Sequence, residues 1–190
     1  MFAQLDTKSV YSFMDSVVDL NSYVERAKEL GYQALGLMDR DNLYAAYHFA
    51  QLASRNGLRP LIGMEANLFY EGRKIPFRLL AKNNQGYKNL MKLATELSSG
   101  QREFTAFSDY LNAIALILPS EDWEPGMTLG SEVFIGVRPE DAGKEFDYPV
   151  VPLHTVRYFE NADRSTIQML HAISQNVSLS EASICPMNQL

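Results

Sequence analysis

Charged side chains gather just after the short apolar segments of this 190-residue sequence. Four carboxylates meeting at strand ends would suit binding of a hard divalent cation or acid–base catalysis. The cations among them argue against a metal, because arginine, and normally lysine, offers hydrogen-bond donors and no lone pair. Two interpretations therefore stay open: a structural network of ion pairs, or a residual metal or catalytic site. The carboxylates are Asp6, Asp15, Asp39 and Glu65, and the cations are Lys8, Arg40 and Arg157.

The other residue types that carry chemistry form no recognisable site. The three histidines show no ligand spacing such as H-x-H. We expect His48 to face solvent or an interface and His171 to pack or cap a helix, whereas His154 ends a predicted strand, where a functional residue is expected. The single cysteine, Cys185, excludes a disulfide framework and has no base partner. No glycine-rich phosphate loop and no serine nucleophile motif is present.

The periodicity of apolar residues defines the elements that must position these groups. Helical spacing recurs over residues 20–30, 43–53 and 87–97, and more weakly over 163–174. Residues 70–73 form a turn that joins two predicted strands into a hairpin. The alternation predicts an α/β fold with a mostly parallel sheet, in which strand ends carry the site, and residues 120–131 form a long surface loop. The predicted strands are residues 2–5, 34–37, 61–69, 75–80, 113–118, 133–137 and 150–153.

Composition narrows the partners and the compartment. The formal net charge is −6, whereas a domain that binds nucleic acid by itself carries a basic face. The length fits one domain. No stretch approaches the roughly 18 apolar residues of a membrane helix, and the first residues do not resemble a signal peptide. We therefore expect a cytoplasmic protein with no membrane partner.

Four blocks of sequence, in fixed order, resemble one protein family. Residues 2–12 read FAQLDTKSVYS, which is similar to F-x-H-L-H-x-H-S-x-Y-S. Residues 27–31 and 34–43 read AKELG and ALGLMDRDNL, and residues 57–65 read GLRPLIGME. Residues 79–90 read LLAKNNQGYKNL. Together they resemble the PHP (polymerase and histidinol phosphatase) domain of bacterial DNA polymerase III alpha subunits of the DnaE type.

The resemblance implies a distorted (β/α)7 TIM-like barrel of the PHP type over residues 1–175. Residues 176–190 would then begin a linker toward the polymerase core. Intact family members bind several divalent metals through His, Asp, Glu and Cys at the strand ends, and this chain departs from that pattern at most ligand positions. Pro119 stands where relatives often carry Cys or Gly. The degenerate ligand positions are Asp6 and Lys8 for H-x-H, Asp39 and Arg40 for Asp-His, Thr155 and Arg157 for Asp-x-His, and the surviving Asp15 and Glu65.

These departures predict a domain without catalytic residues, metal or cofactor, which acts as a structural and protein-interaction module. The resemblance implies the rest of the alpha subunit as partner, a proofreading exonuclease subunit as a further candidate, and DNA contacted only through the parent magnesium-dependent DNA-directed DNA polymerase. The alternative is a phosphoesterase or 3′→5′ exonuclease that binds Mn²⁺ or Mg²⁺ through Asp6, Asp15, Asp39 and Glu65. The expected salt-bridge cluster comprises Asp6, Lys8, Asp39, Arg40, Glu65 and Arg157.

Overall fold

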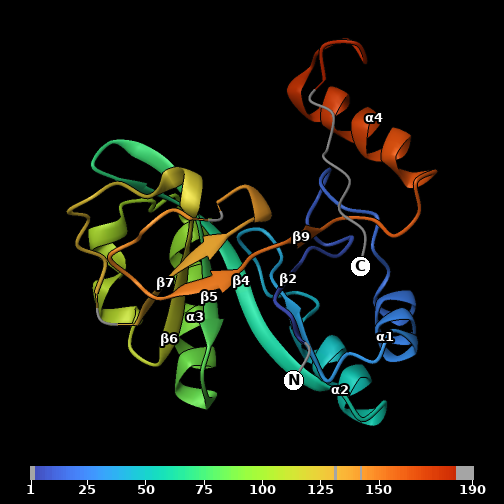
Figure 1. Ribbon diagram of the computed structural model, residues 1–190, viewed down its shortest axis with the longest axis horizontal. Helices are drawn as coiled ribbons and strands as arrows, with labels where there is room; N and C mark the ends of the chain where they lie inside the picture. Colours follow the sequence, from blue (N-terminus) through green and yellow to red (C-terminus); the bar gives the residue numbers. More distant parts are fainter. Residues whose placement is uncertain (1–2, 131, 142, 183–190) are drawn as a thin grey trace. The chain divides into compact units, whose positions relative to one another are not determined.

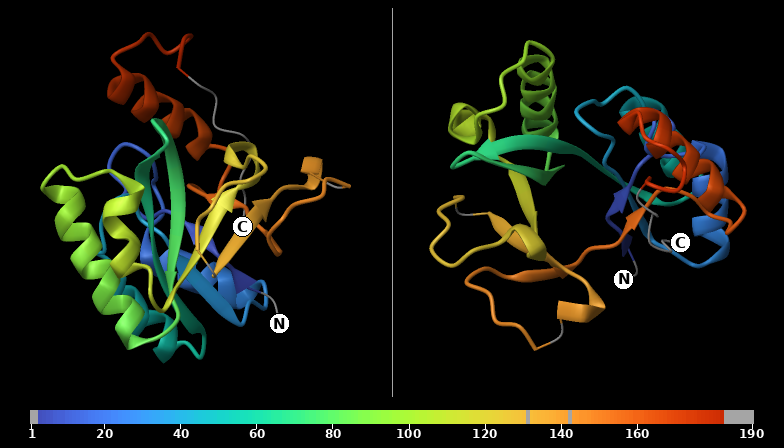
Figure 2. Two further views of the ribbon diagram at one scale, coloured as in Figure 1. Left: turned by 90° about the vertical axis from the view of Figure 1, so that its left-hand side faces the viewer. Right: turned by 90° about the horizontal axis from the view of Figure 1, so that it is seen from above.

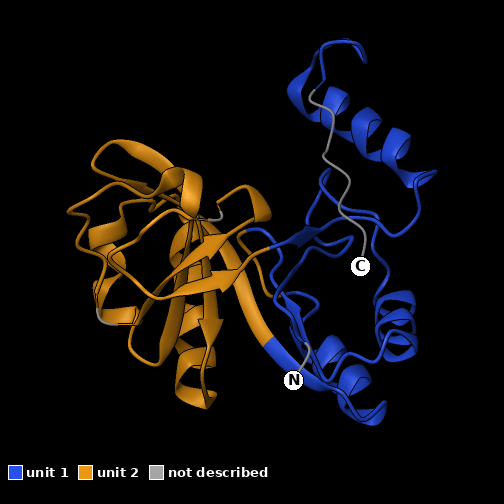
Figure 3. Cartoon of the chain, in the orientation of Figure 1, with its two compact units in different colours: residues 1–40, 44–61, 154–190 blue, residues 41–43, 62–153 orange. Residues whose placement is uncertain are grey.

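Figures 1 and 2 show a computed structural model of the chain, which describes residues 3–130, 132–141 and 143–182. Cys185 and the end of the expected linker lie outside the described residues. The chain divides into two compact units (Figure 3). Unit 1 comprises residues 1–40, 44–61 and 154–190, and unit 2 comprises residues 41–43 and 62–153.

Among its described residues, unit 1 contains short parallel strand pairs and three α-helices. Strand β1 (Ala3–Gln4) pairs in parallel with β3 (Ala34–Leu37), and β2 (Asp6–Thr7) pairs in parallel with β9 (Thr155–Val156). The helices are α1 (Leu20–Glu29), α2 (Ala46–Arg55) and α4 (Asp163–Gln175).

Tyr23 connects the helices of unit 1 to its strands. Its ring is fully buried and stacks on Phe49 of α2 with centroids 5.9 Å apart. Its hydroxyl donates to Gly36 O and accepts from Thr7 Oγ1, each at 2.9 Å. Burial raises the pKa of the phenol far above its ordinary value. The hydroxyl therefore stays protonated while the chain is folded and serves the backbone around β2 and β3.

Unit 2 is built on the larger part of β4 (Arg59–Tyr70), which runs into it from unit 1. Strand β4 pairs with β5 (Arg73–Ala81) and β5 with β6 (Ile114–Pro119), both antiparallel. Strands β7 (Val133–Val137) and β8 (Val150–Pro152) extend the sheet in parallel. Helix α3 (Asn84–Ser98) packs against β5 (Figure 2), and its apolar face joins the core of this unit.

The described part of unit 2 also contains three 3₁₀ helices: η1 (Phe104–Tyr110), η2 (Ser120–Asp122) and η3 (Pro139–Asp141). The buried Asp141 carboxylate fixes the last of these. It accepts from Arg138 N at 2.9 Å, Lys144 Nζ at 2.7 Å and Ser120 Oγ at 2.6 Å. These bonds, the backbone one first, hold the pKa of Asp141 well below its ordinary value, because they favour the ionised form.

The α/β prediction is confirmed, as are the four helices and the hairpin across residues 70–73. The sheet is mixed: β1 with β3, β6 with β7 and β7 with β8 pair in parallel, as expected, whereas β4 with β5 and β5 with β6 pair antiparallel. Its strand order is β1-β3-β4-β5-β6-β7-β8. The sequence also missed β2 and β9, because two-residue strands carry no detectable periodicity. Closure into a barrel stays a prediction.

The loop expected over residues 120–131 is partly structured, as far as Gly130, the last loop residue that the structure describes. Helix η2 occupies its start. Trp123 then packs edge-on against Phe146 with centroids 5.2 Å apart. Tyr148 Oη donates to Met127 O at 2.8 Å, and Thr128 N donates to Tyr70 Oη at 3.1 Å. The loop is therefore anchored to the body of unit 2.

Candidate functional site

Unit 1 brings most of the predicted charged side chains together at the carboxyl ends of its strands. Residue 8 follows β2 directly, residues 39 and 40 follow β3, and residue 157 follows β9. The backbone ties these ends to each other, because Lys8 N donates to Val156 O and Met38 N donates to Thr7 O, each at 2.9 Å. The short strands thus place side chains from three distant parts of the sequence in one region.

Lys8 and Asp6 form an ion pair that is wholly buried. The ammonium nitrogen lies 2.7 Å from Asp6 Oδ1, and both side chains have 0% exposure. Lys8 Nζ also donates to Met38 O at 2.7 Å, and Thr155 Oγ1 donates to Asp6 Oδ2 at 2.7 Å. The two carboxylate oxygens of Asp6 therefore already accept from protein donors.

Asp15 is the centre of a second charged group. Its buried carboxylate pairs with Arg40 Nη2 at 2.6 Å and with Arg157 Nε at 3.1 Å. His171 of α4 adds a third contact, Nε2 to Asp15 Oδ1 at 3.2 Å. One acid thus connects the ends of β3 and β9 with α4.

Asp39 is bound by hydroxyl and amide groups. Its Oδ1 accepts from Ser9 N and Ser12 Oγ, and its Oδ2 accepts from Ser9 Oγ, all at 2.7 Å. Ser12 Oγ also accepts from Arg40 N at 3.1 Å. The carboxylate therefore holds the segment after β2 against the end of β3, whereas the neighbouring arginine side chain turns to Asp15.

Glu65 belongs to unit 2, where it pairs with Arg78 across the β4–β5 hairpin. Glu65 Oε2 lies 3.4 Å from Arg78 Nη2, and both side chains are buried. The two residues face each other in the strand register. Sequence reasoning missed Arg78, although the signal was available: the predicted turn pairs residue 70 with 73, and five further steps along each strand reach 65 and 78.

The histidines contribute one contact to the site. His171 was expected to pack or cap, and it contacts Asp15 from 156 residues away, a partnership that no local pattern indicates. His48 is exposed on α2. His154 is exposed, and its backbone carbonyl accepts from Gln4 Nε2 at 2.7 Å.

Within residues 3–130, 132–141 and 143–182, no group of three or more His, Cys, Asp or Glu side chains is arranged to hold a metal ion. The geometry gives the reason for Asp6, Asp15 and Asp39, whose oxygens accept from lysine, arginine, histidine, serine or threonine. The oxygens of these carboxylates are thus turned toward protein donors, which would compete with a metal ion for them.

The chain has an α/β fold with a group of charged side chains at the ends of its strands. Comparison with known proteins identifies the class of domain to which it belongs. The PHP domain family matches residues 4–138, so the chain belongs to the PHP domain family. The DNA polymerase III subunit alpha of Streptococcus pyogenes serotype M1 is 45% identical over 191 residues, covering 100% of this chain. The subunit of the same name from Bacillus subtilis is 33% identical over 126 residues, covering 63% of this chain. The resemblance read from the sequence is confirmed.

The chain covers 18% of the Streptococcus pyogenes relative and 11% of the Bacillus subtilis one. A solved amidohydrolase from Chromobacterium violaceum superposes with a TM-score of 0.44 at 19% identity, over 53% of this chain and 34% of that one. Among the described residues, no helix combines the length and the apolar character needed to cross a membrane.

Proposed function

We propose that this PHP domain is part of a DNA polymerase III alpha subunit and serves cytoplasmic DNA replication as a structural and protein-interaction module. The identity of 45% across the whole chain to such a subunit supports this assignment. The parent chain would be the DNA-directed DNA polymerase, with magnesium bound in its own core. DNA would be contacted by that core, since this chain carries a net charge of −6.

The observation that carries the module role is the buried lysine after β2. In the family pattern of the sequence, Lys8 stands at a histidine that would bind metal, and here its ammonium is fully buried on Asp6 and Met38 O. An ammonium group at such a position repels a second cation and donates to oxygens that would bind it. We infer that the ion pairs hold the former metal site in shape, and that the domain has no catalytic residue, metal or cofactor.

The phosphoesterase alternative is not favoured. It needs Asp6, Asp15 and Asp39 to direct oxygens at an ion, but each already accepts from protein donors. Glu65 likewise pairs with Arg78.

The domain boundaries and further partners are part of the same proposal. The PHP-type barrel would comprise residues 1–175, and the end of α4 at Gln175, with Asn176 in the left-handed region, supports that limit. The segment 176–190 would lead toward the polymerase core. The rest of the subunit is the first partner, and a proofreading exonuclease subunit is the second.

Asp15→Asn in the full-length alpha subunit tests the module role. The substitution weakens contacts from three segments, so polymerase activity should decay faster at elevated temperature while the rate of primer extension at room temperature stays unchanged. Glu160→Gln, in the exposed Arg26–Glu160 pair, is the matched control and should leave the decay unchanged. A manganese-dependent phosphodiesterase activity of the wild-type subunit that Asp39→Asn abolishes would contradict the proposal.

A further inference from the structure

Unit 2 contains a pocket that the strand-end charges do not use. Its volume is about 750 Å³, which lies within the range of pockets that bind ligands in proteins. It lies between the end of the β4–β5 hairpin, helix η1 and residues 128–130 of the anchored loop. Its floor is apolar and buried, formed by residues such as Phe104, Leu116 and Leu129.

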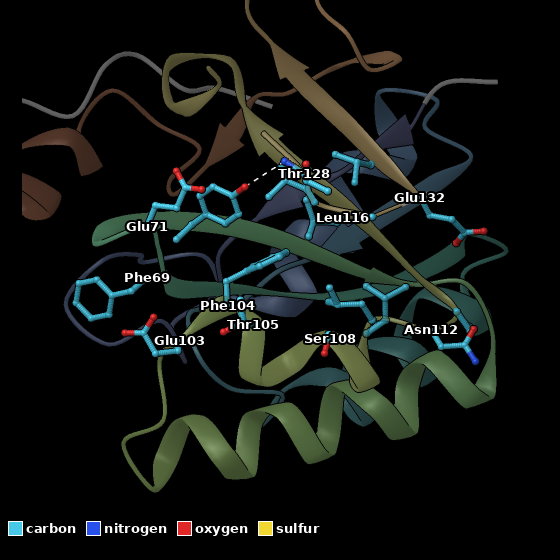
Figure 4. A pocket seen from close by; sticks show the side chains of 17 residues that line it. Phe69, Glu71, Glu103, Phe104, Thr105, Ser108, Asn112, Leu116, Thr128 and Glu132 are labelled. Carbon is cyan, nitrogen blue, oxygen red and sulfur yellow. Dashed lines mark hydrogen bonds between the residues drawn. The ribbon is translucent and has the colours of Figure 1, made fainter. Parts of the chain in front are cut away.

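The pocket has an aromatic wall. Tyr70 and Phe104 meet edge-on with ring centroids 5.5 Å apart, and Phe77 supports Phe104 from the core at 4.9 Å. Thr128 N donates to Tyr70 Oη, and this hydrogen bond ties the loop that carries Thr128 to the aromatic wall (Figure 4). Because these contacts are made within unit 2 itself, the wall is already formed before any ligand enters.

The charge of the lining has one sign. Glu71, Glu103 and Glu132 line the pocket, and the lining contains no lysine, arginine or histidine among the described residues. Glu132 pairs with Lys82, whereas within the described part of the chain the carboxylates of Glu71 and Glu103 make no ion pair. Aromatic faces next to carboxylates attract a cation by two independent mechanisms, the ring quadrupole and direct charge attraction.

The pocket also offers hydrogen-bonding groups along its length. Thr105, Ser108 and Asn112 are exposed, and in the described residues their side chains have no hydrogen-bond partner. Figure 4 shows Glu71 and Glu103 toward one end of the view and Asn112 and Glu132 toward the other. Polar groups spread over this length suit an extended chain better than a compact cation.

We propose that this pocket binds an extended peptide segment of a protein partner, in which a lysine or arginine is flanked by apolar residues. The cationic head would lie between Glu71 and Glu103, while its methylene stem and the apolar neighbours cover Phe69 and Phe104. Thr105, Ser108 and Asn112 would bond to the peptide backbone. This inference deepens the interaction role proposed above and rests on it.

The test selects a random dodecapeptide library on the full-length alpha subunit, with counter-selection on a Ser108→Trp variant whose indole fills the pocket. Affinities of the recovered peptides are then measured by fluorescence polarisation. We expect sequences with lysine or arginine beside leucine, phenylalanine or tyrosine. Their affinity should fall at least about tenfold for Glu71→Gln/Glu103→Gln. Glu25→Gln/Glu29→Gln changes the net charge equally on exposed residues of α1 and should leave the affinity within about twofold.

If the two double variants lost the same amount of peptide affinity, the attraction would be a general effect of net charge and the proposal would be overturned. Selection that enriches no peptides, or that enriches acidic peptides, would also overturn it. Hexylamine offers an ammonium group and an alkyl stem without a peptide backbone. If it bound as tightly as the peptides, the proposal that the ligand is a peptide would be overturned. Melting temperatures of all variants are recorded alongside, and a variant that melts early is replaced by Thr105→Trp as the pocket filler. The structural module role is tested separately, by the heat-inactivation assay of Asp15→Asn. A failure of that role can therefore be distinguished from a failure of the peptide proposal.

Discussion

Replacing Lys8 with methionine removes a buried ammonium and leaves the Asp6 carboxylate in the same enclosed place. Both side chains are fully buried, and the pair is 2.7 Å long. Breaking a buried ion pair by removing one partner costs about 3–5 kcal/mol, because the remaining charge has lost its compensation. Met38 O also loses the donor that lies 2.7 Å away. We expect Lys8→Met to lower the free energy of unfolding by about 3–5 kcal/mol.

The double variant Asp6→Asn/Lys8→Met separates charge from shape. Neutralising the stranded carboxylate removes its desolvation cost, so the double variant should be more stable than Lys8→Met by at least about 1 kcal/mol. Lys82→Met is the matched control, because its partner Glu132 is 42% exposed and such exposed pairs contribute about 0–1 kcal/mol.

Urea unfolding of the 190-residue chain, followed by circular dichroism, measures the wild type, the single variants Lys8→Met, Asp6→Asn and Lys82→Met, and the double variant. A loss below about 1 kcal/mol for Lys8→Met would refute the account of the buried pair. So would a double variant whose loss is the sum of the two single losses, because additive losses mean that the two groups do not interact.

Three further perturbations test the local structure. Asp141→Asn should destabilise the chain at neutral pH. Because the pKa of Asp141 is lowered in the folded chain, its contribution to the free energy of unfolding is present above the ordinary carboxyl pKa of about 4 and is lost as pH falls through the folded pKa. Urea titrations in acid should therefore show a smaller difference in stability between the variant and the wild type. A gap constant with pH would contradict this. Tyr23→Phe leaves Thr7 Oγ1 and the carbonyl of Gly36 without their hydrogen bonds to the phenol, so it should lower the free energy of unfolding in urea by about 1–3 kcal/mol. An unchanged free energy of unfolding would contradict these hydrogen bonds. Gly36→Ala places a Cβ 1.9 Å from Leu5 O, so it should cost at least the ~1–3 kcal/mol of overpacking, and a wild-type melting temperature would exclude that approach.

The sequence predicted the helices well because their apolar stripes face the core of a single unit. Tyr23 and Val24 of α1, for example, are both fully buried. The direction of β6 could not be predicted, because β5 and β6 are separated by α3 and η1 and no local turn specifies their pairing. The mixed sheet is a property of long-range packing, whereas the β4–β5 hairpin is encoded by its own turn.

The types of site residue were predictable, but the partners that come from distant parts of the sequence were not. Lys8 and Asp6 lie two positions apart, and their pairing follows from one short strand. Asp15 finds Arg157 and His171 only through the parallel pairing of β2 with β9 and the placement of α4. The serine ligands of Asp39 went unnoticed because hydroxyl groups carry no charge signal in the sequence.

Metal content tests the central claim most directly. The full-length alpha subunit is purified without chelator, dialysed, and analysed for zinc and manganese by mass spectrometry beside the Asp6→Asn/Asp39→Asn variant. The account predicts far less than one ion per chain in both proteins, because lysine, arginine and serine donors use the oxygens that a metal would need. One or more ions per wild-type chain, absent from the variant, would contradict it.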